Sequence, residues 1–435
     1  MTSPLPDRTL RADAADAPPP GFQVGRSAAW RKWLRYATGC IVATAVILGL
    51  LEIGARLLLS GYPRTFYAHP AGWARVAPYV MYVGDTNLDL DYDELDHYRG
   101  KSYKAHLKTN NYGFRVPLDF GVRMNVPKAD NERVVILTGG SAAYGVGARS
   151  NETTIAGRLE HTLNVRQDRF RYRVYPFAQG GWVAYQEFLA VEMWGRYLHP
   201  DWIISMSGSN DGKLPYHHRQ TVPGAPNNFN SYKLALETIY YKQYYPTLWR
   251  SETAEFLLRN SQLARVVVKQ HPRLPVAVPL RTDFEQLDDS AAWYFHSLRA
   301  LLNVCPKCRY IVATQPISNF EYRYLLADEA DFERVRTNDQ KSWYLYYISR
   351  LIRETPRVVA DFPQVVAYRS MAHTDLVFPG DEAADSRVRR QELFNDDVHM
   401  NDAGQAAVAA FFADIILRSQ AGETVQKFVQ PAEAR

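Results

Sequence analysis

The sequence predicts an α/β protein with a five-stranded, doubly wound parallel sheet, preceded by one N-terminal transmembrane helix. Two observations support this prediction. Apolar runs alternate with helical patterns from residue 134 onward, which is typical of βαβ units. A separate apolar stretch, residues 36–59, is long enough to cross a bilayer as a helix.

The N-terminal region predicts a polar tail followed by a membrane anchor. Residues 1–35 begin with a stretch rich in Pro, Ala and Asp, and we expect a disordered cytoplasmic tail. Near the far end of segment 36–59, Glu52 and Arg56 lie four residues apart, where they can pair and reach the interface. A buried helix of a soluble protein is the alternative, because the uncharged run is shorter than a usual span.

Basic residues set the expected orientation of this anchor. Arg26, Arg31, Lys32 and Arg35 precede the apolar run, and the positive-inside rule then places the N-terminus in the cytoplasm. No small-x-small cleavage site follows the run directly, which favours an uncleaved signal anchor over a removable signal peptide. We expect a single-pass protein of the inner membrane whose body is periplasmic or otherwise extracytoplasmic.

The three cysteines are too few for a disulfide scaffold. Cys40 lies within the apolar stretch, which leaves Cys305 and Cys308 as a pair. In an oxidising compartment this pair can close a local disulfide. A redox-active Cys-x-x-Cys and half of a metal site are the alternatives, but the first lacks its usual surrounding unit and the second lacks further ligands.

Charge and composition exclude some partners. The formal net charge is +5, and residues 1–35 carry six Lys/Arg against three Asp/Glu, so the body is nearly neutral. There is no basic stripe, and we expect no nucleic-acid partner. The 28 Tyr and 9 Trp residues give a high aromatic content, which suits sugar-stacking surfaces as well as an ordinary core.

The body of the chain follows in order. Residues 60–130 predict an irregular, aromatic-rich lead-in, because turn residues interrupt it. A domain at 131–420 follows, with an insertion at about 212–283 and a C-terminal tail at 421–435. Its strands are predicted at 134–138, 172–177, 202–208, 309–314 and 364–370. Its helices are predicted at 152–165, 182–196, 284–303, 330–354 and from about Asp402 onward.

Polar clusters follow four of the predicted strands. The first strand ends at Gly-Gly-Ser141, the second leads to Gly181, and the third leads to Asn210. The last strand precedes a segment that contains Asp396 and His399. Because the carboxyl ends of parallel strands meet at one edge of a sheet, these groups are expected to lie together.

The grouped residue types suit nucleophilic catalysis. Ser141 can act as the nucleophile, His399 as the base, and Asp396 as the group that orients the imidazole. The expected oxyanion donors are the backbone N–H groups of Ser141 and Gly181 and the side-chain amide of Asn210. Taken singly, each motif is also compatible with an ordinary turn.

Ser141, Gly181, Asn210 and the Asp396-x-x-His399 pair, in this order, resemble the four blocks of the SGNH (GDSL-like) hydrolase superfamily. The KTNNYGFR stretch and the N-terminal anchor resemble membrane-tethered members found beside bacterial envelope and exopolysaccharide genes. The resemblance implies a flavodoxin-like three-layer α/β/α sandwich and metal-independent acyl-ester chemistry without a cofactor.

The match to the family pattern departs at three points. Gly140 stands where the namesake Gly-Asp-Ser has Asp, a change that leaves the nucleophile in place. The second block reads Gly180-Gly181, and its register on Tyr185-Gln186 favours Gly181 as the donor. Asp397 also lies beside the histidine, although the spacing selects Asp396.

Some polar and aromatic residues have simpler interpretations. His217 and His218 suggest a metal site, but without a partnered carboxylate we expect a loop at the rim of the cleft. Tyr144, Trp182 and Tyr185 can stack on a sugar ring or pack against the sheet, and we favour packing.

The leading hypothesis is an extracytoplasmic esterase that removes O-acyl groups, acetyl above all, from a carbohydrate. An O-acetyltransferase that uses the same triad on an envelope polysaccharide is the first alternative, and it would need an acyl-donor partner in the membrane. A non-catalytic polysaccharide-binding or assembly protein is the second, because a fold alone does not establish an activity.

Overall fold

The computed structural model describes residues 26–58, 74–77, 79–116, 127–167, 169–212, 261, 263, 285–318, 340–371 and 392–428. The chain divides into two units. The first contains the N-terminal helix and residues 261–269, and the second contains the α/β body. Most of the predicted insertion at 212–283 lies outside the described residues.

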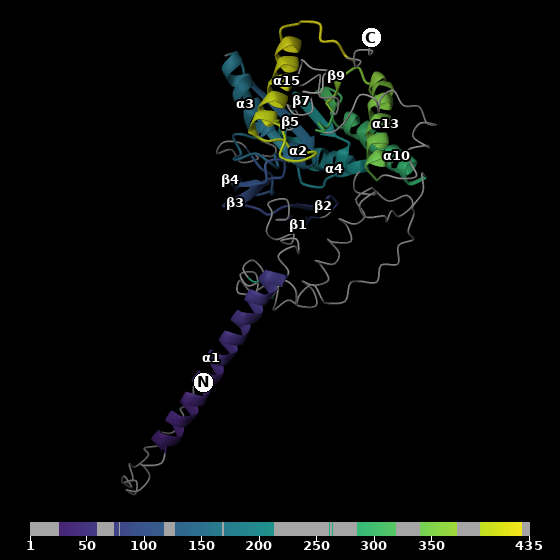
Figure 1. Cartoon of the computed structure of the whole chain (residues 1–435). Helices are drawn as coiled ribbons and strands as arrows, with labels where there is room; N and C mark the ends of the chain where they lie inside the picture. Colours follow the sequence, from purple (N-terminus) through teal and green to yellow (C-terminus); the bar gives the residue numbers. More distant parts are fainter. Residues whose placement is uncertain are drawn as a thin grey trace, which may run out of the picture. The chain divides into compact units, whose positions relative to one another are not determined.

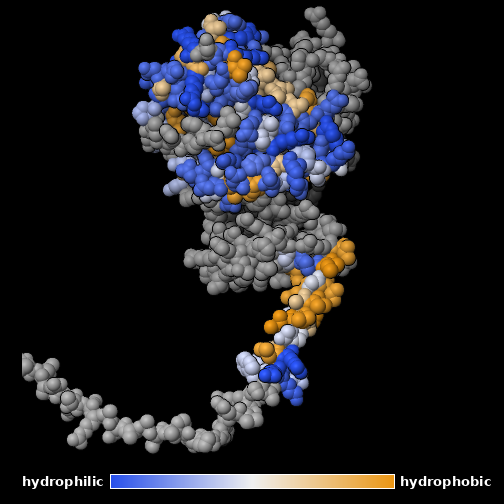
Figure 2. Space-filling model, turned by 90° about the vertical axis from the view of Figure 1, so that its left-hand side faces the viewer, coloured by the Kyte–Doolittle hydropathy of each residue, from blue (hydrophilic) through white to orange (hydrophobic). Residues whose placement is uncertain are grey.

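The first unit contains helix α1, Arg26–Leu58. Its segment Trp30–Ala55 is long and apolar enough to cross a membrane. Figure 2 shows hydrophobic residues along α1, with hydrophilic residues gathered toward its N-terminal end. The helix starts within the predicted 1–35 tail, so that prediction is wrong for residues 26–35, where good helix formers such as Ala, Arg and Lys extend the apolar helix.

Glu52 has hydrogen-bond partners within this first unit. Its Oε2 accepts from the hydroxyl of Ser261 at 2.7 Å and from the backbone N–H of Leu263 at 2.9 Å. These donors offset the cost of a carboxylate near the end of an apolar helix. The side chain of Arg56, the predicted partner, lies outside the described residues.

The second unit is built on a five-stranded sheet of order β6-β5-β7-β8-β9. All its neighbouring strands are parallel. The strands are β5 (Glu132–Gly139), β6 (Arg171–Ala178), β7 (Trp202–Ser207), β8 (Arg309–Thr314) and β9 (Val365–Ser370). This arrangement confirms the predicted parallel α/β sheet.

Helices cover both faces of the sheet and complete three layers (Figure 1). On one face α3 packs on α15, and on the other α10 packs on both α4 and α13. Their bounds are α3 (Ile155–Arg166), α4 (Ala184–Met193), α10 (Glu285–Val304), α13 (Gln340–Ala360) and α15 (Asp402–Gln420). Two shorter helices are α2 (Ser141–Tyr144) and the 3-10 helix η2 (Gly195–Leu198).

Strand periodicity explains the two cores of this sandwich. In β5, Val134 and Ile136 join the core cluster on one face, and Val135 and Leu137 join the cluster on the other. Successive side chains of a strand point to opposite faces, so a strand buried on both faces reads as a continuous apolar run. This is why VVIL predicted a central strand.

Helix starts follow local capping. Thr154 precedes α3, and its Oγ accepts from the N–H of Gly157 at 3.1 Å. Asn401 precedes α15, and its Oδ1 accepts from the N–H groups of Ala403 and Gly404. The cap of α15 is therefore Asn401, while the carboxylate of Asp402, the first residue of the helix, accepts from the N–H of Arg149.

The predicted irregular lead-in at 60–130 is wrong for much of residues 74–108, which form two antiparallel hairpins. Strands β1 (Ala74–Ala77) and β2 (Met81–Gly84) make the first hairpin. Strands β3 (Asp89–Asp96) and β4 (Lys101–Lys108) make the second. Opposite charges face each other across the second hairpin, as between Asp93 and Lys104 at 2.9 Å, and such cross-strand pairs stabilise strands of low intrinsic propensity.

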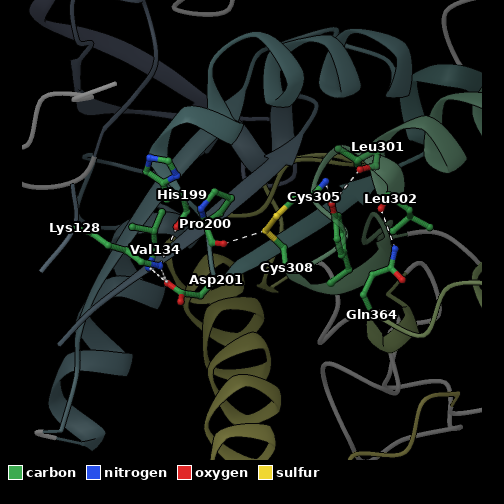
Figure 3. Close-up of a disulfide and its surroundings, with 11 residues drawn as sticks. Lys128, Val134, His199, Pro200, Asp201, Leu301, Leu302, Cys305, Cys308 and Gln364 are labelled. Atoms are coloured by element: carbon green, nitrogen blue, oxygen red, sulfur yellow. Dashed lines mark hydrogen bonds and ion pairs between the residues drawn. A yellow bond between two sulfur atoms is a disulfide. The ribbon is translucent and has the colours of Figure 1, made fainter. Parts of the chain in front are cut away.

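Cys305 and Cys308 form a disulfide in the turn between α10 and β8, with a Cα–Cα distance of 5.3 Å. Figure 3 shows this bond beside Pro200, whose carbonyl oxygen lies 3.0 Å from Cys308 Sγ. The N–H of Cys305 donates to the hydroxyl of Tyr310, the second residue of β8, at 3.1 Å. The disulfide thus ties the start of β8 to the end of α10, as the sequence suggested.

Candidate active site

Ser141 lies directly after strand β5, at the first position of α2. The turn that presents it requires a residue without a side chain, because a Cβ on Gly139 would lie 2.4 Å from the carbonyl oxygen of Met206. After α2 the chain turns at Gly145, whose φ of 89° suits glycine. The serine is nearly buried, at 9% exposure, and its hydroxyl lies at the carboxyl edge of the sheet.

The structure brings Ser141, His399 and Asp396 into one hydrogen-bonded chain. His399 Nε2 lies 2.7 Å from Ser141 Oγ. His399 Nδ1 lies 2.6 Å from Asp396 Oδ2. A carboxylate beside Nδ1 favours the tautomer with the proton on Nδ1, which leaves Nε2 free to accept the serine proton.

Asp396 stays ionised in this arrangement. Burial alone would raise the pKa of its carboxyl, but the hydrogen bond and charge of His399 and two backbone donors outweigh it, so the pKa falls well below its usual range. Those donors are the N–H groups of Val398 and His399, which lie 2.8 and 2.7 Å from Oδ1. The side chain is therefore fixed at both oxygens, and it fixes the ring in turn.

The three predicted oxyanion donors come from the ends of three neighbouring strands. Gly181 follows β6 with a φ of 78°, a conformation that favours glycine. Asn210 follows β7, and its Nδ2 donates to the carbonyl of Trp182 at 2.8 Å. Within the described part of the chain, the backbone N–H groups of Ser141 and Gly181 donate to no protein acceptor, so both remain available to a ligand.

Asn210 Nδ2 also lies close to the residue before the serine. A Cβ placed on Gly140 would stand 2.4 Å from Asn210 Nδ2 and 3.3 Å from the carbonyl oxygen of Trp182. The Asn210 amide thus lies within contact distance of both the loop after β6 and the turn that carries Ser141. Gly140, which departs from the namesake motif, leaves room for this amide.

Two buried carboxyl groups lie behind these donors. Asp211 accepts from the N–H of Ala184 at 3.2 Å, and burial raises its pKa to about 7. Glu187 accepts from the hydroxyl of Ser207 at 2.6 Å, and burial also raises its pKa well above the usual value. Asp211 therefore links the loop after β7 to the start of α4, just beyond Gly181.

The first hairpin supports the Gly181 loop, which the sequence did not predict. The hydroxyl of Tyr82 donates to the carbonyl of Gly180 at 2.9 Å, and the indole of Trp182 donates to the carbonyl of Tyr82 at 3.0 Å. Gln186 Nε2 donates to the carbonyl of Val80 at 2.8 Å. Tyr82 gave no recognisable signal, because its partners lie about a hundred residues away in the chain.

Arg115 is a second supporting residue that sequence reasoning did not single out. It is buried, and it donates to the carbonyls of Gly145 and Ala148 at 2.7 and 3.3 Å and to Asn151 Oδ1 at 3.0 Å. These acceptors lie in the turn that follows Ser141. The KTNNYGFR stretch, which ends at Arg115, was the one available signal.

The tip of the second hairpin, residues 97–100, contacts the loop that carries Asp396 and His399. The N–H of Tyr98 donates to the carbonyl of Asn395 at 3.1 Å, and its hydroxyl donates to Asp397 Oδ1 at 2.9 Å. Arg99 donates to the carbonyl of Glu392 at 2.9 Å. The hairpin therefore belongs to the structure of the site.

The three aromatic residues considered for sugar stacking differ in how deeply they are buried. Tyr144 and Trp182 are buried at 2% and 0% exposure, which confirms packing for these two. Tyr185 is half-buried, with its ring 5.9 Å from that of Trp293. Among the described residues, no group of three or more His, Cys, Asp or Glu side chains could hold a metal ion, and His217 and His218 lie outside those residues.

Comparisons with known proteins find similar folds among solved structures. No family model and no curated protein matches the sequence. Solved structures match with 65–69% of this chain covered. The acetyl xylan esterase AlAXEase has 14% identity, a TM-score of 0.37 and 99% of its chain covered.

Two further solved structures match with similarly low identity and TM-score. A lipase/acylhydrolase from Enterococcus faecalis has 11% identity, a TM-score of 0.33 and 99% of its chain covered. A two-domain esterase active on acetylated mannans has 11% identity, a TM-score of 0.34 and 53% of its chain covered. At such low identities and scores, the chemistry of this protein has to be inferred from Ser141, His399 and Asp396 themselves.

Proposed function

We propose that this protein is a serine esterase of the SGNH type that removes O-acyl groups, acetyl above all, from a carbohydrate. The observation that carries the proposal is the relay from Ser141 Oγ through His399 to Asp396, with distances of 2.7 and 2.6 Å. The neighbouring N–H groups of Ser141 and Gly181 and the amide of Asn210 add the donors that acyl transfer needs.

The first half of the reaction forms an acyl-serine. Ser141 Oγ attacks the ester carbonyl carbon while His399 Nε2 takes the hydroxyl proton. The carbonyl oxygen becomes an oxyanion, which the N–H groups and the Asn210 amide stabilise. The intermediate collapses when the C–O bond to the alcohol breaks, and the imidazolium of His399 gives its proton to the departing alcohol oxygen.

The second half regenerates the serine. Water attacks the acyl carbon, His399 takes one water proton, and the acyl–Oγ bond breaks as that proton returns to Ser141. A carboxylic acid leaves. If a sugar hydroxyl takes the place of water, the same residues transfer the acyl group instead, so the acceptor decides between hydrolysis and transfer.

The carbohydrate part of the proposal draws on two similar folds, an acetyl xylan esterase and an esterase active on acetylated mannans. We further propose that α1 anchors the protein in the inner membrane with its N-terminus in the cytoplasm, because Arg31, Lys32 and Arg35 lie at that end. The disulfide between Cys305 and Cys308 supports an oxidising, extracytoplasmic location for the body.

Hydrolysis of p-nitrophenyl acetate by the detergent-solubilised chain tests the proposal. Wild type should release p-nitrophenol, and Ser141→Ala and His399→Ala should each lose several orders of magnitude in kcat. A covalent acetyl group on Ser141, detected by mass spectrometry after rapid acid quench, would identify the intermediate. A Ser141→Ala variant as active as wild type would exclude the site. Acetyl transfer to an added polysaccharide would identify the transferase.

A further inference from the structure

A cavity of about 170 Å³ lies beside the catalytic histidine. Three segments line it: the second hairpin, the turn after α2, and the loop that carries the Asp-His pair. The lining residues are Glu94, Leu95, His97, Val146, Gly147, Asn395, Asp396 and His399. At roughly 30 Å³ of liquid volume per water molecule, the space suits a group about the size of one sugar ring, well below a drug-sized site.

The wall of this cavity contains groups that bind hydroxyls. The Glu94 carboxyl and the His97 imidazole come from the hairpin, and Asn395 comes from the opposite loop. Carboxylate, imidazole and amide groups together can accept from and donate to the hydroxyls of a polyol. Leu95 and Val146 supply the apolar remainder, which matches the C–H surface of a sugar ring.

Asn395 is a fixed part of the cavity wall. It is 2% exposed, and its Nδ2 donates to the hydroxyl of Tyr103 at 2.6 Å and to the carbonyl of Gly147 at 3.3 Å. A carbonyl only accepts, so this orientation of the amide is fixed. Within the described chain, Asn395 Oδ1 then has no donor, although buried acceptors are costly to leave unsatisfied.

The cavity also lies beside the residue that handles the departing alcohol. In the proposed reaction, His399 returns its proton to the alcohol oxygen of the ester, so that oxygen lies near the imidazole. The oxyanion donors after β6 and β7 are absent from the cavity lining. The carbonyl oxygen of the ester, which those donors would bind, therefore lies away from this space, and the alcohol portion can lie toward it.

The hairpin tip is held in place strongly enough to define a binding wall. Tyr98 lies next to His97, and its hydroxyl lies 2.5 Å from Ser318 Oγ, in the loop after β8, and 2.9 Å from Asp397 Oδ1. Arg99 pairs with Asp96 at 2.5 Å while it holds the Glu392 carbonyl. His97 thus has a neighbour on each side that is fixed to the hairpin or to the catalytic loop.

We propose that this cavity binds the alcohol portion of the ester, a hydroxyl-bearing sugar ring, and that His97 and Leu95 of the hairpin determine specificity for it. This proposal rests on the proposed esterase function and adds the part of the molecule that selects the alcohol. It predicts that changes at the hairpin tip alter discrimination between alcohols that carry the same acetyl group.

The test compares two acetate esters with the full chain in detergent. One is a mono-O-acetylated methyl glucoside, and the other is ethyl acetate, whose alcohol is too small to fill the cavity. The measured quantity is the ratio of their kcat/KM values, determined for wild type, His97→Ala and Leu95→Trp. His106→Ala is the matched control, because His106 lies on the same hairpin but contacts Asp89 and Asp91.

His97→Ala should lower the ratio about tenfold, the effect of one lost hydrogen bond. Leu95→Trp should lower it at least as much, because the larger side chain fills the space. The control should keep the wild-type ratio. Wild-type ratios in both folded variants, or equal losses on both esters, would overturn the proposal. Absence of Ser141-dependent hydrolysis of either ester by wild type would instead refute the esterase function itself.

Discussion

Gly140→Ala is expected to disable the proposed oxyanion site without touching Ser141, His399 or Asp396. The new Cβ would lie 2.4 Å from Asn210 Nδ2. Ordinary contact begins near 3.4 Å, so the amide must move by about 1 Å, and a misplacement of that size can cost about a hundredfold in rate. Loss of one oxyanion donor costs about a hundredfold to a thousandfold in kcat.

The same change should have little effect on folding. Gly140 has φ −82° and ψ −150°, a conformation that alanine also adopts, so no backbone strain arises. The atom that the Cβ meets first is the end of an Asn side chain, which can rotate away. We therefore expect a fall in kcat of at least about a hundredfold with a melting temperature close to that of wild type.

A double-mutant cycle checks the cause. If Gly140→Ala acts by displacing the amide, it should cost little in an Asn210→Ala background, because the group that it displaces is already gone. The assay is kcat for p-nitrophenyl acetate in wild type, both single variants and the double variant. Fully additive losses would refute the reasoning, and so would a Gly140→Ala enzyme with wild-type kcat.

Three further predictions concern the relay, the buried carboxyl and the disulfide. Asp396→Asn should lower kcat about ten-thousandfold with unchanged folding by circular dichroism, because the amide favours the wrong imidazole tautomer; a small loss would contradict this role. Burial raises the pKa of Asp211 to about 7, so its contribution to stability is complete below about pH 4 and is lost as pH rises toward 7. Urea titrations should show a smaller decline over this range in Asp211→Asn, and an identical decline would exclude Asp211 as a source. Replacing Cys305 and Cys308 by Ser should lower the free energy of unfolding by roughly 2 kcal/mol, because that is the loop-closure entropy of so short a ring. Urea titrations of this variant should be insensitive to dithiothreitol, whereas those of wild type should not.

The central sheet was predictable because its signals are local. Each observed strand begins and ends within two residues of its predicted range. Strands buried on both faces require continuous apolar runs, and those runs can be read from the chain without knowing their partners. The meeting of Ser141 with the Asp396–His399 pair was predictable for a related reason, since the ends of parallel strands share one edge of the sheet.

The hairpins were not predictable in the same way. Strand β3 reads DLDYDELD, and Asp is depleted in strands. Its burial nevertheless alternates, with Tyr92, Glu94 and Asp96 inward. What stabilises it is the partner strand, where Lys104 and Lys108 pair with Asp93 and Asp89, and these pairs become favourable only once the register is known.

Three parts of the segment before residue 131 each support a different loop of the candidate site. Tyr82 of the first hairpin holds Gly180, Tyr98 of the second contacts the Asp396–His399 loop, and Arg115 holds the turn after Ser141. Each support is a hydrogen bond to a backbone carbonyl or a carboxylate, so it fixes loop position rather than chemistry. A serine relay needs its members placed to within a fraction of an ångström, and the strands end before those members begin. The lead-in therefore belongs to the same unit as the candidate site, and a domain boundary at 131 would remove residues that hold the loops of that site.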